Sequence, residues 1–260
     1  MSGTWTFGDL EFKVMWEILE EDFLPWPLVF TSRTALWEDY LQEKAEVKDR
    51  LRRTLDPALR EVLEAMQFPD IRLVVYGWDD RDGLNPDFCL RVLGVRRADR
   101  GLVVKQRCGE TIWHSAGFEV TECGALELGE RIVSALPPAA AGRMADVVLL
   151  TEADGDLDYT FGDSAVRDSF ADSVVHRSEA FLGKSAASIG TIEIIQGHSV
   201  FGPRGITKHV IGWRDLQDDG RYAIEDQYPK VAVPADHKRM TTMVNTRIAA
   251  VIRAIKDEPA

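Results

Sequence analysis

Two segments, VLGVRRADRG at residues 92–101 and VIGWRDLQDDG at residues 210–220, decide the fold class. Each begins with an apolar stretch that contains one glycine, continues through charged residues and ends on a second glycine. Apolar stretches rich in Val and Ile on either side of a polar turn are typical of β-hairpins. In each half of the chain a further strand and a helix with an apolar stripe follow, and hairpins that precede helices favour an antiparallel sheet. We therefore predict an α+β fold with a central antiparallel β-sheet, helices packed on its faces and pseudo-twofold halves.

Outward from these hairpins, the spacing of apolar residues predicts the other elements. Strands are expected at residues 4–7, 71–78, 88–95, 101–107, 145–150, 191–197, 206–213, 220–226 and 230–233, with one more within 111–121. Helices are expected at residues 9–20, 34–54, 56–67, 124–136, 164–182 and 235–256. We predict a single domain over residues 1–260, with repeat halves at about 1–138 and 139–260.

Apolar residues at helical spacing predict which side chains face the core. The helix at 34–54 should turn inward Trp37, Leu41, Ala45, Val47 and Leu51, and the last helix Met240, Val244, Ile248, Val251 and Ile255. Three tryptophans lie on apolar periodicities and are expected in the core: Trp16, Trp37 and Trp213. Two others, Trp26 and Trp78, stand beside prolines or a polar loop, where core packing and a binding anchor are equally good interpretations.

The charge balance narrows the classes of partner. Forty-three acidic side chains against 31 basic ones leave a formal net charge of −12. Such a surface repels phosphate backbones and anionic lipid, so we expect neither nucleic-acid binding nor membrane insertion. No signal-peptide pattern stands at the amino terminus, which favours a cytoplasmic location. Cys89, Cys108 and Cys123 share no metal-binding spacing and are expected to behave as small apolar residues.

Patterns that would signal catalysis or a cofactor are incomplete. The tripeptide Gly183-Lys184-Ser185 resembles the end of a phosphate-binding loop, but the preceding glycine of that motif is replaced by Ser178. Asp154, Asp156 and Asp158 alternate as calcium ligands do, without the glycine and the glutamate that complete such a loop. The five histidines include no pair at metal-binding helical spacing. We therefore expect no enzyme activity, no cofactor and no metal.

The sequence resembles the EspG family along nearly its whole length. The segments that carry the resemblance are WTFGDLEFKVMWE at 5–17, LPWPL at 24–28, YGW at 76–78, LPP at 136–138, and IGW at 211–213 with DGRY at 219–222. The resemblance implies an α+β fold with quasi-twofold halves. It also implies a cytosolic chaperone of type VII (ESX) secretion, which binds PE–PPE heterodimers, keeps them soluble and directs them to export.

The resemblance also implies where a partner would bind. The family's contact surfaces correspond here to the loop after the strand at 71–78 and to the exposed face of the last helix. The candidate partner-binding residues are Trp78, Asp79, Asp80, Arg81, Asp82, Asn85 and Asp87. A purely solvated hairpin loop explains this segment as well. The partner would be a PE–PPE-like or other helical secretion substrate, and the chain itself a monomer or weak homodimer. The alternative is a small-molecule-binding α+β domain or an enzyme that uses the concave side of the sheet.

Overall fold

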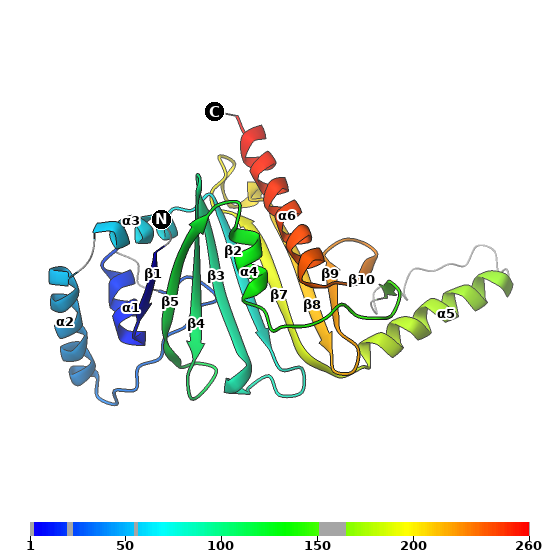
Figure 1. Ribbon diagram of the computed structural model, residues 1–260, viewed down its shortest axis with the longest axis horizontal. Helices are drawn as coiled ribbons and strands as arrows, with labels where there is room; N and C mark the ends of the chain where they lie inside the picture. Colours follow the sequence, from blue (N-terminus) through cyan, green and yellow to red (C-terminus); the bar gives the residue numbers. More distant parts are fainter. Residues whose placement is uncertain (1–2, 20–22, 55–56, 151–164, 260) are drawn as a thin grey trace.

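The computed structural model describes residues 3–19, 23–54, 57–150 and 165–259. In this part of the chain ten strands form one sheet (Figure 1). The strands are β1 (Thr4–Phe7), β2 (Ile71–Trp78), β3 (Cys89–Arg97), β4 (Arg100–Cys108), β5 (Ser115–Gly124), β6 (Val147–Leu149), β7 (Ala186–Gln196), β8 (Lys208–Leu216), β9 (Arg221–Glu225) and β10 (Lys230–Pro234). The helices are α1 (Asp9–Glu17), α2 (Trp37–Thr54), α3 (Pro57–Gln67), α4 (Leu128–Ser134), α5 (Ala165–Leu182) and α6 (His237–Asp257), with 3-10 turns η1 (Pro86–Phe88) and η3 (Gly202–Gly205).

The strand order places β2 and β7 at the middle of the sheet. From one edge to the other it is β1-β5-β4-β3-β2-β7-β8-β9-β10-β6, and every neighbouring pair is antiparallel. On one side of the central β2–β7 pair the strands follow in chain order from β2 to β5 toward the edge. On the other side β7 to β10 follow in chain order in the same way. The predicted antiparallel α+β fold is confirmed, and both hairpins that predicted it, β3–β4 and β8–β9, are present. The division into repeat halves of a single domain stays a prediction.

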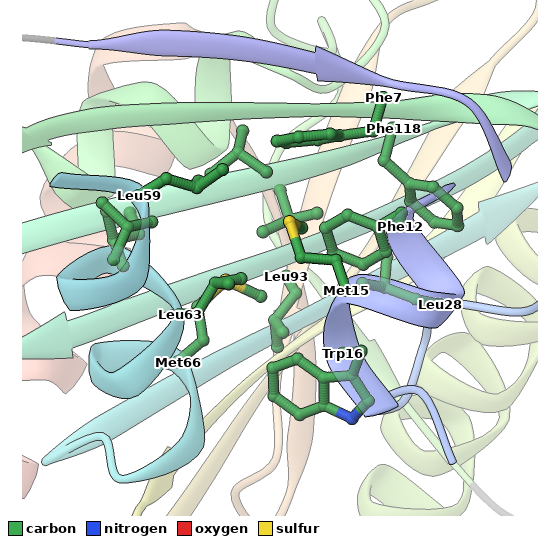
Figure 2. Close-up of a cluster of buried hydrophobic side chains, with 14 of the residues drawn as sticks. Phe7, Phe12, Met15, Trp16, Leu28, Leu59, Leu63, Met66, Leu93 and Phe118 are labelled. Atoms are coloured by element: carbon green, nitrogen blue, oxygen red, sulfur yellow. The ribbon is translucent and has the colours of Figure 1, made fainter. Parts of the chain in front are cut away.

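Helices cover the two faces of the sheet unequally. Helices α4 and α6 lie across one face (Figure 1), where α6 buries Met240, Val244, Ile248 and Val251 against β7 and β8, as the stripe predicts. Helices α1 and α3 pack on the other face, over β3 to β5, around an aromatic cluster that includes Phe12 and Phe118 (Figure 2). A third cluster joins β6, β9 and β10 to Phe181 at the end of α5.

Trp213 is the largest fully buried side chain of the core, and two glycines make room for it. A Cβ atom added at Gly190 would lie 2.2 Å from the Trp213 ring, and one added at Gly77 would lie 2.7 Å from it. Ser188 accepts a hydrogen bond from the indole Nε1 at 3.3 Å. The predicted core positions of Trp16 and Trp213 are thus confirmed.

The predicted core position of Trp37 is wrong. Its side chain is 68% exposed, and Leu41 is exposed as well. Of the predicted stripe, Val47 and Leu51 are buried and Ala45 is exposed. Tyr40 is buried as well, and Lys44 lies between Tyr40 and Val47. The Lys44 Nζ lies 2.7 Å from Glu17 on α1, so a charged residue occupies the inner stripe by pairing with the neighbouring helix. The periodicity of apolar residues passes over such a lysine, so it places Trp37 and Leu41 inward in the first half of the helix, where Tyr40 and Lys44 lie inward instead.

Strand β7 begins five residues before its predicted start at residue 191. Its first residues are small and have weak strand preference. They extend the strand because they pair with β8, from Ala186 opposite Leu216, and because the Ser188 hydroxyl donates to Asp215 at 2.6 Å. Tertiary pairing therefore overrides local preference. The predicted acidic loop at residues 152–163, with Asp154, Asp156 and Asp158, lies outside the described residues.

Candidate partner-binding surface

The loop after β2 is organised by its own side chains. The Asp79 carboxylate accepts hydrogen bonds from the backbone N–H of Arg81 at 2.9 Å and from its guanidinium at 3.1 Å. These hydrogen bonds, with a further one from Asn85, lower the pKa of Asp79 to about 2. Asp79 is buried, so among the predicted site residues it serves to shape the loop.

Two further polar residues close turns within the loop. Asp82 accepts from the backbone N–H of Leu84 at 3.1 Å, and Asn85 accepts from that of Asp87 at 3.0 Å. Asn85 thereby caps η1, the 3-10 turn that leads into β3. The side chains left toward solvent are those of Arg81, Asp82, Leu84 and Asp87, and Leu84 is 69% exposed. The loop thus presents one apolar side chain among charges on a fixed backbone.

Asp80 ties this loop to the second half of the sheet. Its carboxylate lies 3.2 Å from the Arg214 guanidinium on β8 and accepts from the backbone N–H of Ala186 at 3.3 Å. The same Arg214 nitrogen donates to the carbonyls of Leu182 and Lys184, at the end of α5. The loop position therefore depends on a junction between β2, β7, β8 and α5.

Trp78 belongs to a row of aromatic side chains. Its ring stacks on that of Tyr76, with centroids 6.0 Å apart, and the Tyr76 ring meets Trp26 edge to face at 5.6 Å. The Arg91 guanidinium lies 5.7 Å from the Trp26 ring centroid. Trp78 is half-buried, whereas Trp26 is 55% exposed and offers a ring surface of the kind that anchors partners.

A groove of about 300 Å³ continues from Trp78 across the sheet. Most of its residues come from β7, β8 and β9, and the apolar and small ones include Ile189, Thr191, Val210, Gly212 and Ile224. Charged side chains also line it: Arg214, Glu225, Asp226 and Lys230. These apolar and small residues are half-buried, while the alternate residues of the same strands, such as Ile192 and Ile211, are fully buried under α6. One face of these strands is thus open in the described structure. The sequence analysis missed this groove because both faces of β7 are rich in apolar residues.

The exposed face of α6 is separate from this surface. Helix α6 lies on the face of the sheet opposite to the groove, because the residues beneath it alternate with the groove residues along β7 and β8. Its solvent side is basic and includes Lys238, Arg239, Arg253 and Lys256. The geometry therefore joins the loop to the groove, and leaves the face of α6 as a second, oppositely charged surface.

A second hollow, of about 530 Å³, lies at the turn between β8 and β9. Asp219 lines it, and although burial opposes the shift, hydrogen bonds from Tyr222 and Arg143 lower the pKa of Asp219. Burial and the bond to Asp219 raise the pKa of Tyr222 to about 12. Asp219 thus accepts hydrogen bonds from both Tyr222 and Arg143 at this hollow. In the described part of the chain no cluster of three or more His, Cys, Asp or Glu could hold a metal.

Comparison with solved structures identifies the class of fold. Among twelve matching chains is the Mycobacterium tuberculosis type VII secretion system chaperone EspG5, solved in complex with a PE25–PPE41 dimer. The match has a TM-score of 0.53 at 14% sequence identity and covers 100% of this chain and 99% of the other. At this identity the match concerns the fold. A search of curated proteins returned no significant match.

The sequence profile of the EspG family matches residues 9–246. The match spans most of the chain, from the first turn of α1 into α6. The chain therefore belongs to the EspG family, and the resemblance seen in the sequence is confirmed. Among the described residues, no helix is long and apolar enough to cross a membrane.

Proposed function

We propose that the protein is a cytosolic, non-enzymatic chaperone of type VII secretion that binds a PE–PPE-like helical substrate and keeps it soluble for export. The observation that carries the proposal is family membership over residues 9–246. The full-length fold match to EspG5, a chaperone solved with a PE–PPE dimer, supports it. We further propose that the chain acts as a monomer or weak homodimer.

We place the partner on the loop–groove surface, which consists of the loop at 79–87, the aromatic row and the groove on β7 to β9. Exposed apolar side chains, Leu84 and Trp26, stand beside an open apolar strip of sheet. A helical tip with apolar residues would bury this area, and such burial drives most protein association. The charges of Asp82 and Asp87 at the rim would select and orient a complementary partner.

Co-expression with a PE–PPE-like pair from the same genome tests the role and the surface together. Two variants probe the surface. Leu84→Asp places a charge on the exposed apolar side chain of the loop without removing the bonds that shape it. Gly212→Val fills the floor of the groove, since a Cβ at this position has no neighbour nearer than 3.7 Å. The matched control is Leu126→Asp, the same change at a leucine that is 93% exposed at the opposite end of the sheet.

Wild type and Leu126→Asp should co-elute with the soluble pair on size-exclusion chromatography. Each surface variant should weaken the affinity about five- to thirtyfold, as expected when an anchor of about 1–2 kcal/mol is lost. If both surface variants bind like wild type, the chaperone role stands and the proposed surface is wrong. If wild type itself neither binds nor solubilises any such pair, while a metabolite co-purifies stoichiometrically, the chaperone proposal fails in favour of a small-molecule-binding domain.

A further inference from the structure

Cys89 and Cys108 stand at neighbouring ends of β3 and β4. The β3–β4 pairing runs from Arg97 opposite Arg100 to Val92 opposite Lys105. Three more residues in the same register bring Cys89 opposite Cys108. The structure keeps them adjacent, because the Cys108 Sγ lies 3.0 Å from the Cys89 carbonyl oxygen. Both thiols are free.

Alternation of side chains along β3 and β4 assigns both thiols to one face of the sheet. Cys89 alternates in step with Leu93, and Cys108 with Val104, while the pairing of β4 with β5 shifts register between Arg107 and Cys108. Leu93 and Val104 both belong to the cluster beneath α1 and α3. Directly opposed residues in an antiparallel pair have Cβ atoms about 4.5–5.5 Å apart. A disulfide needs about 3.5–4.5 Å, a closure of roughly 1 Å at the strand ends.

The three cysteines differ in access. Cys108 is exposed, Cys89 is half-buried and Cys123 is buried. Burial raises the pKa of the Cys123 thiol, which keeps that group protonated. An oxidant therefore meets Cys108 first, with Cys89 as the nearest second thiol.

We propose that Cys89 and Cys108 form a reversible, peroxide-responsive dithiol pair. The Cys108 thiolate attacks hydrogen peroxide, breaks the O–O bond and becomes a sulfenic acid with release of hydroxide. The Cys89 thiolate then attacks the Cys108 sulfur, forms the S–S bond and displaces the hydroxyl group as water once it takes up a proton. In sum, two thiols and one peroxide give one disulfide and two waters.

The disulfide would fasten the end of the β3–β4 hairpin next to Trp78, which pairs with Cys89 from β2. Cross-linking restricts the unfolded chain and should raise the urea midpoint of the oxidised protein. This inference does not depend on the proposed function.

The test is brief treatment of the folded chain with hydrogen peroxide, followed by intact mass and non-reducing peptide mapping. Wild type and Cys123→Ser should each lose two hydrogen atoms, yield a linked Cys89–Cys108 peptide pair and return to the dithiol with dithiothreitol. Cys89→Ser should instead accumulate a sulfenic acid at Cys108 that dimedone traps. The proposal is overturned if wild type stops at the sulfenic acid, forms disulfide-linked dimers, or links either thiol to Cys123.

Discussion

The buried ion pair between Asp215 and Arg221 gives the sharpest stability prediction. Arg221 donates two hydrogen bonds of 2.7 Å to the Asp215 carboxylate, which also accepts from Ser188 at 2.6 Å. Arg221 is 2% exposed and Asp215 6%. The Arg221 guanidinium also donates to the carbonyl of Pro137 at 2.7 Å, so this pair connects β8 and β9 to the segment after α4.

Replacing Asp215 by Ala leaves the Arg221 guanidinium buried and without its counter-ion. Removing one partner of a buried pair typically costs about 3–5 kcal/mol, because the remaining charge keeps its desolvation penalty. Proteins have unfolding free energies of about 5–15 kcal/mol in total, so the Asp215→Ala variant should lose a large fraction of its stability. The double variant Asp215→Leu/Arg221→Met removes both charges and should regain most of the loss.

Urea unfolding followed by circular dichroism measures these differences. The matched control is Asp218→Ala, the same change at an exposed position three residues away, which should shift the free energy of unfolding by no more than about 0.5 kcal/mol. The reasoning is refuted if Asp215→Ala loses less than about 1 kcal/mol, or if the double variant is as unstable as the single one.

Two further predictions concern the glycines of the sheet and the loop after β2. Gly190→Ala should lower stability by about 1–3 kcal/mol because its Cβ would collide with the Trp213 ring. Gly212→Ala faces the open groove and should change the melting temperature little; equal effects of the two changes would contradict the assigned faces. Arg81 holds the pKa of Asp79 at about 2 against a usual 3.8. The stabilisation from ionised Asp79 is therefore present at pH values above its unfolded-state pKa of 3.8 and is lost as the pH falls through about 2. Carboxyl carbon NMR should show this midpoint, and a midpoint near 3.8 would count against the Asp79–Arg81 bonds.

Local pattern in the sequence predicted much of the fold. The two hairpins around Gly101 and Gly220, the buried strand β2 and the inner stripe of α6 each follow from the spacing of apolar residues over a short segment. Together they were enough for an antiparallel α+β fold. The EspG resemblance rested on ordered short motifs and was confirmed by the family match.

Tertiary structure alone decided the candidate site. On α2, Trp37 is exposed while Lys44 lies between two buried residues and pairs with Glu17 on another helix. Asp80 serves as a junction to Arg214, and Asp79 as a support for the loop, although both look like surface acids in the sequence. The open groove, the basic face of α6 behind it and the approach of Cys89 to Cys108 likewise depend on which strands are neighbours. Sequence periodicity shows which residues lie on the same face of a helix or strand. Only the packing of distant segments determines which of those faces is covered.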